Sequence, residues 1–326
     1  MKLCIFSFIC LLLISKHFIY SQENIPDRKG IHPTNVNYFQ NPLPINDELL
    51  LTNEKRSHLY TYKENTEFPE LLFADTITDF SVSWSKKYIG LILKNNGILR
   101  PGIFSFKNRK IKHFDLRLSE GSKITCHDTL LCCLSNDTLF FISDNDIDFI
   151  TYKKINKIEI SPDGSKILFN DFNGYLYNVF IKNKSINEIK TETYVSDFKW
   201  SPEGKKIAIT DGLIINIIRL EDKANFIIGN GGNFCWSEDS EYLIYQKNQP
   251  IKMKFVNSDI FIAKYDNTQT YQITNTNNLF EMQPVFKTNN IIYYTTYEDR
   301  AIYKAELKNF AITKEKTVFS IKQKGE

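Results

Sequence analysis

The sequence has little of several things that would mark a special class of protein. Its 326 residues include only 13 glycines and 10 prolines, and 41 basic residues nearly balance 38 acidic ones at a net charge of +3. So few glycines and prolines exclude a collagen-like or low-complexity chain. The small net charge provides no strong attraction to nucleic acid or to an anionic membrane surface, so we expect no nucleic-acid partner.

Long hydrophobic runs are missing too, and the one notable apolar run is short and N-terminal. Leu3–Ile14 are twelve uncharged, mostly apolar residues between Lys2 and Lys16. A membrane-spanning helix needs roughly 20 such residues, whereas a charged start, a short apolar stretch and a small residue are typical of a secretory signal. We therefore predict a signal peptide over residues 1–21, cleaved after Ser21. The protein would be exported, either periplasmic or secreted, with no membrane span in the mature chain; an uncleaved anchor is the alternative.

Cysteine is scarce as well. Four of the six cysteines follow the predicted signal: Cys126, Cys132, Cys133 and Cys235. Small secreted domains that depend on disulfides are far richer in cysteine. The adjacent Cys132 and Cys133 lie in an apolar strand-like run, so they should point to opposite faces. We interpret all four as small buried hydrophobic residues, and the stability of the fold must then come from apolar burial.

A sustained helical period of apolar residues is also absent, and the chain has an internal repeat instead. Trp84, Trp200 and Trp236 are each followed by serine. The strings ISPDGSKILFN at 160–170 and WSPEGKKIAIT at 200–210 are nearly superimposable, and weaker copies occur elsewhere. Repeats of this kind indicate one supersecondary unit written several times.

The spacing of the copies gives their number. Trp84, Ile160, Trp200, Trp236 and Phe286 are separated by 76, 40, 36 and 50 residues, a period near 40 with one copy hidden in the first gap. Residues 123–144 supply that copy, and residues 43–64 have the same shape one period earlier. We count seven units; six, with the first unit packed elsewhere, is the alternative.

Each unit has the pattern of four short strands joined by tight turns. Pro162 and Pro202 preset φ for a turn, and Gly164 and Gly204 tolerate positive φ, so these strings are hairpin corners and not phosphate-binding loops. Apolar residues alternate along the first strand and should share one face in each copy. These sets are Phe80, Val82 and Trp84; Ile158 and Ile160; Phe198 and Trp200; Phe234 and Trp236.

Four-stranded units repeated about every 40 residues predict an all-β fold, a single β-propeller of four-stranded antiparallel blades. We assign residues 22–39 to an N-terminal leader and residues 40–326 to the propeller. An open ring would expose a blade face, so the last blade must pack against the first. We expect Val36–Leu43 or Thr317–Ile321 to supply the strand that completes this joint, so that deleting residues 308–326 destabilises the whole domain.

The WSPDG-type strings resemble the repeat of TolB-like, WD40-like β-propellers. Residues 258–286 follow that family's third strand, connecting turn, fourth strand and entry to the next blade. The resemblance covers most of residues 43–307 and implies the propeller fold. It implies little about function, because this repeat occurs in many unrelated proteins. Only about 20 residues separate the predicted cleavage site from the first blade, unlike the best-known member with its preceding α/β domain, so a Tol-system role is in doubt.

No motif predicts catalysis. The chain has no G-x-S-x-G nucleophile elbow, and Ser161 and Ser201 lie beside proline in turns with no recurrent histidine nearby. We therefore assign no catalytic residue from the sequence.

Metal and cofactor sites are not expected either. No histidines have the H-x-x-x-H spacing, and the neighbours Cys126, His127 and Asp128 should point apart. The acidic string at 144–148 starts like a calcium loop but has Phe149 and Ile155 where that loop needs glycine and glutamate. We interpret it as a solvated turn between third and fourth strands.

Candidate ligand-binding residues lie at the two ends of the repeat array. Arg56, His58 and Tyr60 belong to the first unit, and Tyr297 and Arg300 to the last, near Tyr293, Tyr294 and Tyr303. Ring closure would make the two groups neighbours and create a mixed aromatic and basic patch. Ordinary strand packing is the alternative interpretation.

Two classes of function remain. The first is a monomeric, non-catalytic interaction module that binds an envelope or secreted protein or peptide at the propeller mouth. The second is a propeller enzyme, a lyase, lactonase or glycan-active protein, whose polar residues converge in the central channel. Several histidines or carboxylates facing one another in the channel would favour the enzyme, whereas serine, threonine and apolar groups would favour binding.

Overall fold

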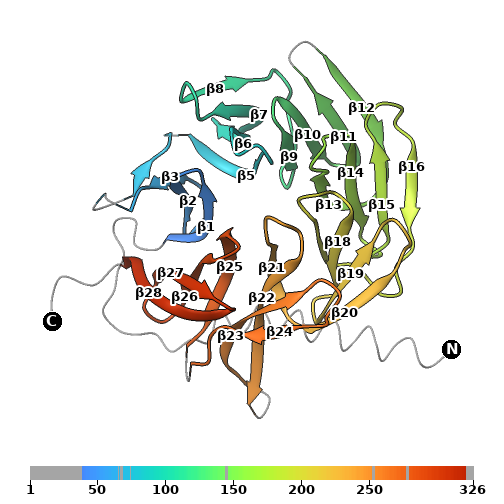
Figure 1. The fold of residues 1–326 in the computed structure, drawn as a ribbon. Coiled ribbons are helices and arrows are strands. Elements are labelled where there is room, and N and C mark those ends of the chain that lie inside the picture. Colours follow the sequence, from blue (N-terminus) through green and yellow to red (C-terminus); the bar gives the residue numbers. More distant parts are fainter. Residues whose placement is uncertain are drawn as a thin grey trace. The chain divides into compact units, whose positions relative to one another are not determined.

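The computed structural model describes residues 39–320 except for short gaps at 65, 67–68, 74, 144–145, 252–253 and 277–278. The predicted signal peptide and the leader up to residue 38 lie outside the described residues. Over the described part, the chain forms 28 strands in seven four-stranded antiparallel sheets. The sheets follow one another around a ring, with the first strand of each innermost (Figure 1). The fold is thus a seven-bladed β-propeller, and the alternative of six blades is wrong.

Each blade uses four consecutive strands. Blade 1 contains β1 (Phe39–Ile45), β2 (Glu48–Asn53), β3 (Leu59–Tyr62) and β4 (Glu70–Leu71); blade 2 contains β5 (Thr76–Val82), β6 (Tyr88–Asn95), β7 (Ile98–Ser105) and β8 (Lys110–His113). Blade 3 contains β9 (Lys123–His127), β10 (Leu130–Ser135), β11 (Thr138–Ile142) and β12 (Ile147–Thr151); blade 4 contains β13 (Ile155–Ile160), β14 (Lys166–Asp171), β15 (Leu176–Phe180) and β16 (Ile186–Ile189).

The remaining blades have the same order. Blade 5 contains β17 (Asp197–Trp200), β18 (Lys206–Thr210), β19 (Ile214–Arg219) and β20 (Asn225–Asn230); blade 6 contains β21 (Gly232–Trp236), β22 (Tyr242–Ile251), β23 (Lys254–Lys264) and β24 (Thr270–Gln272). Blade 7 contains β25 (Glu281–Thr288), β26 (Ile291–Thr296), β27 (Ala301–Lys308) and β28 (Ala311–Ser320).

The core consists of seven apolar clusters, one between each pair of neighbouring blades. Alternation along each strand explains this arrangement, because successive side chains point to opposite faces. Cys132 packs between blades 3 and 4, while its neighbour Cys133 packs between blades 2 and 3. Cys126 is also buried and Cys235 is half-buried in the cluster between blades 6 and 7. Burial is thus confirmed for Cys126, Cys132 and Cys133, with the last two on opposite faces as predicted, whereas Cys235 is only half-buried.

The predicted shared faces hold in three copies and fail in one. Ile158 with Ile160, Phe198 with Trp200, and Phe234 with Trp236 each lie in one cluster. Phe80 and Val82 contact the cluster between blades 1 and 2. Trp84, however, follows the end of β5 and contacts the clusters on either side of blade 4. The strand ends two residues before Trp84, so period-two alternation no longer sets its direction.

The Ser-x-acid turns are held by their own side chains. Ser161 Oγ donates to Asp163 Oδ1 (2.5 Å) and accepts from the Lys166 amide (3.0 Å), and Asp163 Oδ1 also accepts from the Ser165 amide (3.0 Å). Gly164 has a φ of +70°, as its turn position predicts. Ser161 is therefore a buried turn residue and not an available nucleophile.

We expected Val36–Leu43 or Thr317–Ile321 to supply the strand that completes the joint, and Phe39 of the first segment and Phe319 of the second both pack in it, from separate sheets. β1 is the inner strand of blade 1 and β28 the outer strand of blade 7, so neither completes the other's sheet. The joint instead packs the rings of Phe39, Tyr62 and Phe319 together, with centroids 5.3 and 5.9 Å apart for the two contacts of Phe319. The Tyr62 hydroxyl donates to the Val318 carbonyl (2.9 Å).

Glu64 adds an ionic contact to this joint. It accepts hydrogen bonds from Lys304 (2.7 Å), Lys316 (2.8 Å) and the Tyr293 hydroxyl (3.1 Å), all of blade 7. Partial burial alone would raise the pKa of Glu64, but the two lysines outweigh it and lower the pKa to about 2. The joint between blades 1 and 7 therefore contains, besides its packed rings, one carboxylate of blade 1 that accepts from three donors of blade 7.

Candidate functional site

The two ends of the ring carry different loops. In an antiparallel blade that begins on its inner strand, the loops between second and third strands lie at the end where the first strand starts, together with the connections from blade to blade. We call this the entry end. The hairpins between first and second strands lie at the opposite end, which we call the hairpin end.

The sequence-predicted residues of blade 1 lie in or beside an entry-end loop. Asn53 Oδ1 accepts from the amides of Ser57 (2.8 Å) and His58 (3.2 Å), which shapes the loop between β2 and β3. Arg56 has a φ of +51° in this loop, and the His58 ring contacts Ser57 Oγ (3.0 Å). Tyr60 lies in β3 and packs edge-on against the ring of Phe39 in β1 of the same blade.

The residues of blade 7 lie in the loop between β26 and β27, also at the entry end. The Tyr297 amide donates to the Phe280 carbonyl (3.1 Å), and its side chain is exposed. Arg300 has a φ of +52°. Asp299 in the same loop accepts hydrogen bonds from the hydroxyls of Thr296 and Tyr303.

Ring closure places these two groups on adjoining blades. Among the described residues, however, no hydrogen bond, ion pair or ring contact joins Arg56, His58 or Tyr60 to Tyr297 or Arg300. The mixed aromatic and basic patch remains a prediction. The nearby tyrosines have structural partners instead: Tyr293 and Tyr294 are buried and donate to Glu64 and Glu315.

Sequence reasoning missed a set of charged residues on the inner strands of blades 2, 4 and 5. Asp79 Oδ2 accepts from the Ile124 amide of the next blade (2.8 Å). Lys157 forms an ion pair with Asp197, also of the next blade, and donates to the Phe198 carbonyl (2.9 Å). Burial alone would raise the pKa of Asp197, but Lys157 lowers it. These side chains alternate with core residues, so the period-two pattern that revealed the core also marked them.

Glu159 is the least satisfied of these groups. It lies on β13 between core residues Ile158 and Ile160, and its Oε2 atom is buried with no hydrogen-bond partner among the described residues. Burial raises the pKa of Glu159 to about 7, although Lys157 and Lys199 oppose the rise. The inner strands of blades 4 and 5 therefore carry carboxylates, which an enzyme could use for catalysis. Lysines alternate with these carboxylates, which is the arrangement of a structural network of ion pairs.

The hairpin end is occupied by aromatic side chains that link blades. Each tryptophan donates its indole N–H to a backbone carbonyl of another blade: Trp84 to Ile160 (3.1 Å), Trp200 to Glu159 (3.4 Å) and Trp236 to Lys199 (3.3 Å). In blade 3 the corresponding place is taken by His127, whose Nε2 contacts the Pro162 carbonyl (2.9 Å).

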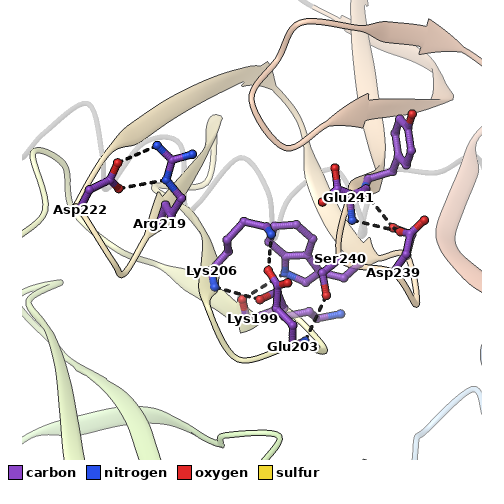
Figure 2. Close-up of polar contacts among 12 residues, drawn as sticks. Lys199, Glu203, Lys206, Arg219, Asp222, Asp239, Ser240 and Glu241 are labelled. Atoms are coloured by element: carbon purple, nitrogen blue, oxygen red, sulfur yellow. Dashed lines mark hydrogen bonds and ion pairs between the residues drawn. The ribbon is translucent and has the colours of Figure 1, made fainter.

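The hairpins themselves also touch around this end. Figure 2 shows the contact between blades 5 and 6, where the Glu203 amide donates to Ser240 Oγ (3.1 Å). Glu203 pairs with Lys206 of its own hairpin, and Arg219 makes a two-pronged contact with Asp222 (2.6 and 3.0 Å). These bonds connect turns to turns and tie the polar groups to the scaffold.

The suspected metal trio is split. Cys126 Sγ contacts the Ser81 carbonyl, His127 contacts Pro162, and Asp128 accepts from Ser85 Oγ. Burial raises the pKa of the Cys126 thiol to about 12, which disfavours the thiolate that a metal needs. Within the described part of the chain, no group of three or more histidine, cysteine or acidic side chains is placed to hold a metal ion.

Two cavities stand out. One of about 350 Å³ lies on blade 2 and is lined by Asp75, Leu93, Asn95, Ile98, Arg100, His113, Phe114 and Asp115. The other, about 70 Å³, lies between the hairpins of blades 4 and 5. Neither cavity is lined by Asp79, Glu159 or Asp197, the carboxylates of the inner strands.

Comparisons with known proteins agree on the fold. No family model and no curated protein matches the sequence. Among solved structures, the β-propeller domain of Cps50 (Swd1) from Myceliophteria thermophila has a TM-score of 0.60 at 11% identity, covering 84% of this chain and 99% of that one. TolB from Acinetobacter baumannii has a TM-score of 0.52 at 13% identity, covering 77% and 65%. A prolyl endopeptidase structure has a TM-score of 0.64 at 10% identity, covering 87% of this chain and 50% of that one.

These likenesses establish the architecture. The chain has the β-propeller fold of TolB-like and WD40-like repeat proteins, as the repeat strings predict. At such low identity the shared fold carries no activity with it. None of the described residues belongs to a helix long and apolar enough to cross a membrane.

Proposed function

We propose that this propeller is an exported, non-catalytic interaction module that binds a protein or peptide at its entry end. Loops supported by a rigid scaffold are common sites of recognition. The partner would be an envelope or secreted protein, and the propeller would act as a monomer. The charged start and the short N-terminal apolar run described above support export, which N-terminal sequencing of protein from the native host would test.

The observation that carries the proposal is the difference between the two ends. At the hairpin end, indoles and turn hydroxyls are committed to contacts between blades. At the entry end, several loops present exposed side chains, including Tyr297 in blade 7 and Tyr194 before blade 5. A partner therefore finds free recognition groups at the entry end.

Site-specific photo-crosslinking in the native host tests this assignment. A crosslinking amino acid replaces Lys123 or Arg56 at the entry end, or Lys182 or Lys223 in exposed loops at the hairpin end. The proposal expects a discrete protein adduct from the first pair only. Adducts from the second pair alone would place binding at the hairpin end and contradict the assignment. The absence of an adduct from every position would contradict an interaction module.

Glu159 favours a second candidate, a propeller enzyme of the lyase, lactonase or glycan-active kind. A buried carboxyl with a pKa near 7 and a free oxygen is suited to general acid or base chemistry. Turnover of a lactone or polysaccharide substrate by the mature protein, abolished in a folded Glu159→Gln variant, would support it. Turnover unchanged by that substitution would exclude Glu159 as the catalytic group.

A further inference from the structure

Five large apolar side chains are exposed on three successive entry-end loops of blades 4 and 5. They are Phe172 and Tyr175 between β14 and β15, Tyr194 before β17, and Leu213 and Ile214 at the turn into β19, with exposed fractions from 36% to 64%. We call this set the blade 4–5 patch. Gathered apolar exposure of this kind is uncommon on a monomeric protein and marks sites of association.

The three loops pack side by side. The Tyr194 ring covers Gly174, where a side chain would lie only 2.2 Å from Tyr194 Cδ2, and the Val195 amide donates to the Gly174 carbonyl (3.0 Å). In the next loop, a Cβ at Gly212 would lie 3.8 Å from Ser196 Oγ. The loops that carry the patch are therefore neighbours, so its five residues are gathered in one region of the entry end.

Both hairpins of the patch are fixed before any partner arrives. Asp171 Oδ1 accepts from the amides of Asn173 and Tyr175 (2.9 Å each). Asp211 Oδ1 accepts from the amides of Leu213 and Ile214 (2.8 Å each). Pre-organised loops lose little conformational entropy on binding, so their apolar side chains suit recognition.

The charges beside the patch indicate the chemistry of its partner. Lys154 adjoins Phe172, whose amide donates to the Lys154 carbonyl (3.0 Å), and Lys190 lies one step beyond the Leu176–Ile189 pair, opposite Tyr175. Both lysines are exposed, and their ammonium groups have no hydrogen bond or ion pair among the described residues. The nearby carboxylates keep their charge but face the backbone: Asp171 and Asp211 accept from amides of their own turns, and Asp137 Oδ1 accepts from the Lys154 amide (2.9 Å). Glu192 is an exposed acid on these loops.

We infer that the blade 4–5 patch docks an apolar segment of a partner protein whose flanking residues are acidic. The aromatic and aliphatic side chains bury the apolar segment, and the two lysines meet the flanking carboxylates. This inference rests on the proposed function, because it names the surface and the partner chemistry for the same entry end.

Two synthetic peptides of about a dozen residues test the inference by fluorescence anisotropy. Both carry the same phenylalanines and leucines, spaced by Asp and Glu in one and by Lys in the other. The acidic peptide should bind the wild type at least about tenfold more tightly than the basic one, and high salt should weaken it. A Phe172→Ser/Leu213→Ser variant should lose about tenfold in affinity, and Lys154→Glu/Lys190→Glu should lose the preference for acid.

The matched control is Ile227→Ser, because Ile227 is exposed to the same extent as Phe172 but lies on the outer strand β20. It should leave binding unchanged, and equal melting temperatures should show that all variants are folded. Equal binding of both peptides, or equal weakening by the control, would overturn the inference. So would self-association of the wild type, or its binding to anionic vesicles, if the Phe172→Ser/Leu213→Ser variant abolished either.

The crosslinking experiment separates this inference from the proposed function. If entry-end adducts of the wild type persist in the Phe172→Ser/Leu213→Ser variant, the interaction module stands and the patch is not its docking surface. If the wild type forms no adduct at all, the proposed function itself fails. Loss of the adducts in this variant but not in Ile227→Ser supports both.

Discussion

Two glycines with the same backbone geometry differ in what surrounds them. Gly164 and Gly204 have φ values of +70° and +72°, so any side chain at either position meets left-handed strain of about 1–2 kcal/mol. A Cβ at Gly164 would also lie 2.7 Å from the His127 ring, whereas at Gly204 the nearest atom is Pro162 Cδ at 3.6 Å. The two similar turn motifs therefore tolerate a side chain at the glycine unequally.

We predict that Gly164→Val destabilises the protein more than Gly204→Val. The second substitution should cost about 1–2 kcal/mol, and the first at least about 1 kcal/mol more because the His127 ring must move. Chemical denaturation of both variants measures the difference. Equal losses, or a loss at Gly164 that His127→Ala does not relieve, would contradict the role of this contact.

A pH-dependent prediction concerns Glu159. Its pKa is raised from 4.5 to about 7 in the folded protein, so between these values the folded state keeps a proton that the unfolded state has lost. Stability should therefore fall as the pH rises from about 4.5 to 7, by about 1–3 kcal/mol. Glu159→Gln should remove this loss and be more stable than the wild type at neutral pH, but not below pH 4.5.

Denaturation curves across that pH range measure the effect. Glu192→Gln, which changes an exposed carboxyl, is the control and should keep the wild-type profile. A Glu159→Gln profile parallel to that of the wild type would show that this carboxyl is ionised in the folded protein.

At the scale of elements, the strands were predictable from the sequence, but some side-chain directions and contacts between blades were not. The repeat strings place β13, β14, β17 and β18 correctly, because hairpin turns and alternating core residues are local signals. The direction of Trp84 was not predictable, since it depends on where β5 ends. The ion pair between Lys157 and Asp197 was not predictable either, because the alternation along each strand does not show which residue of the next blade lies opposite.

We predict that β28 is essential to the ring. Deleting residues 311–326 removes Phe319 from the joint and the outer strand of blade 7, so the whole domain should melt at a lower temperature and blade 1 should lose protection in hydrogen exchange. Deleting only residues 321–326, which follow β28, is the control. Unchanged protection of blade 1 in the longer deletion would mean that the joint holds without this strand.

For the molecule as a whole, Glu64 makes closure of the ring sensitive to acid. With its pKa lowered from 4.5 to about 2, Glu64 contributes stability that is fully present above pH 4.5 and is lost as the pH falls toward 2. Glu64→Gln should cost about 1–3 kcal/mol at neutral pH and should weaken the dependence of stability on pH in that acidic window. Thermal melts at several pH values measure both effects.

Glu306→Gln is the matched control, because Glu306 pairs with Lys314 of the same blade at 3.8 Å and is more exposed. It should cost under about 1 kcal/mol. A loss as large as that of Glu64→Gln would mean that acidic residues of this region matter only through their general charge.

The joint between blades 1 and 7 also determines how the ring bears mechanical load. A force pulling Phe39 and Ser320 apart acts on strands of two different sheets, so no ladder of backbone hydrogen bonds among the described residues resists it. The resistance comes from ring contacts, from the Tyr62 hydroxyl and from the salt bridges of Glu64. Under tension this seam should yield first and turn the closed ring into an open arc, before any blade unravels.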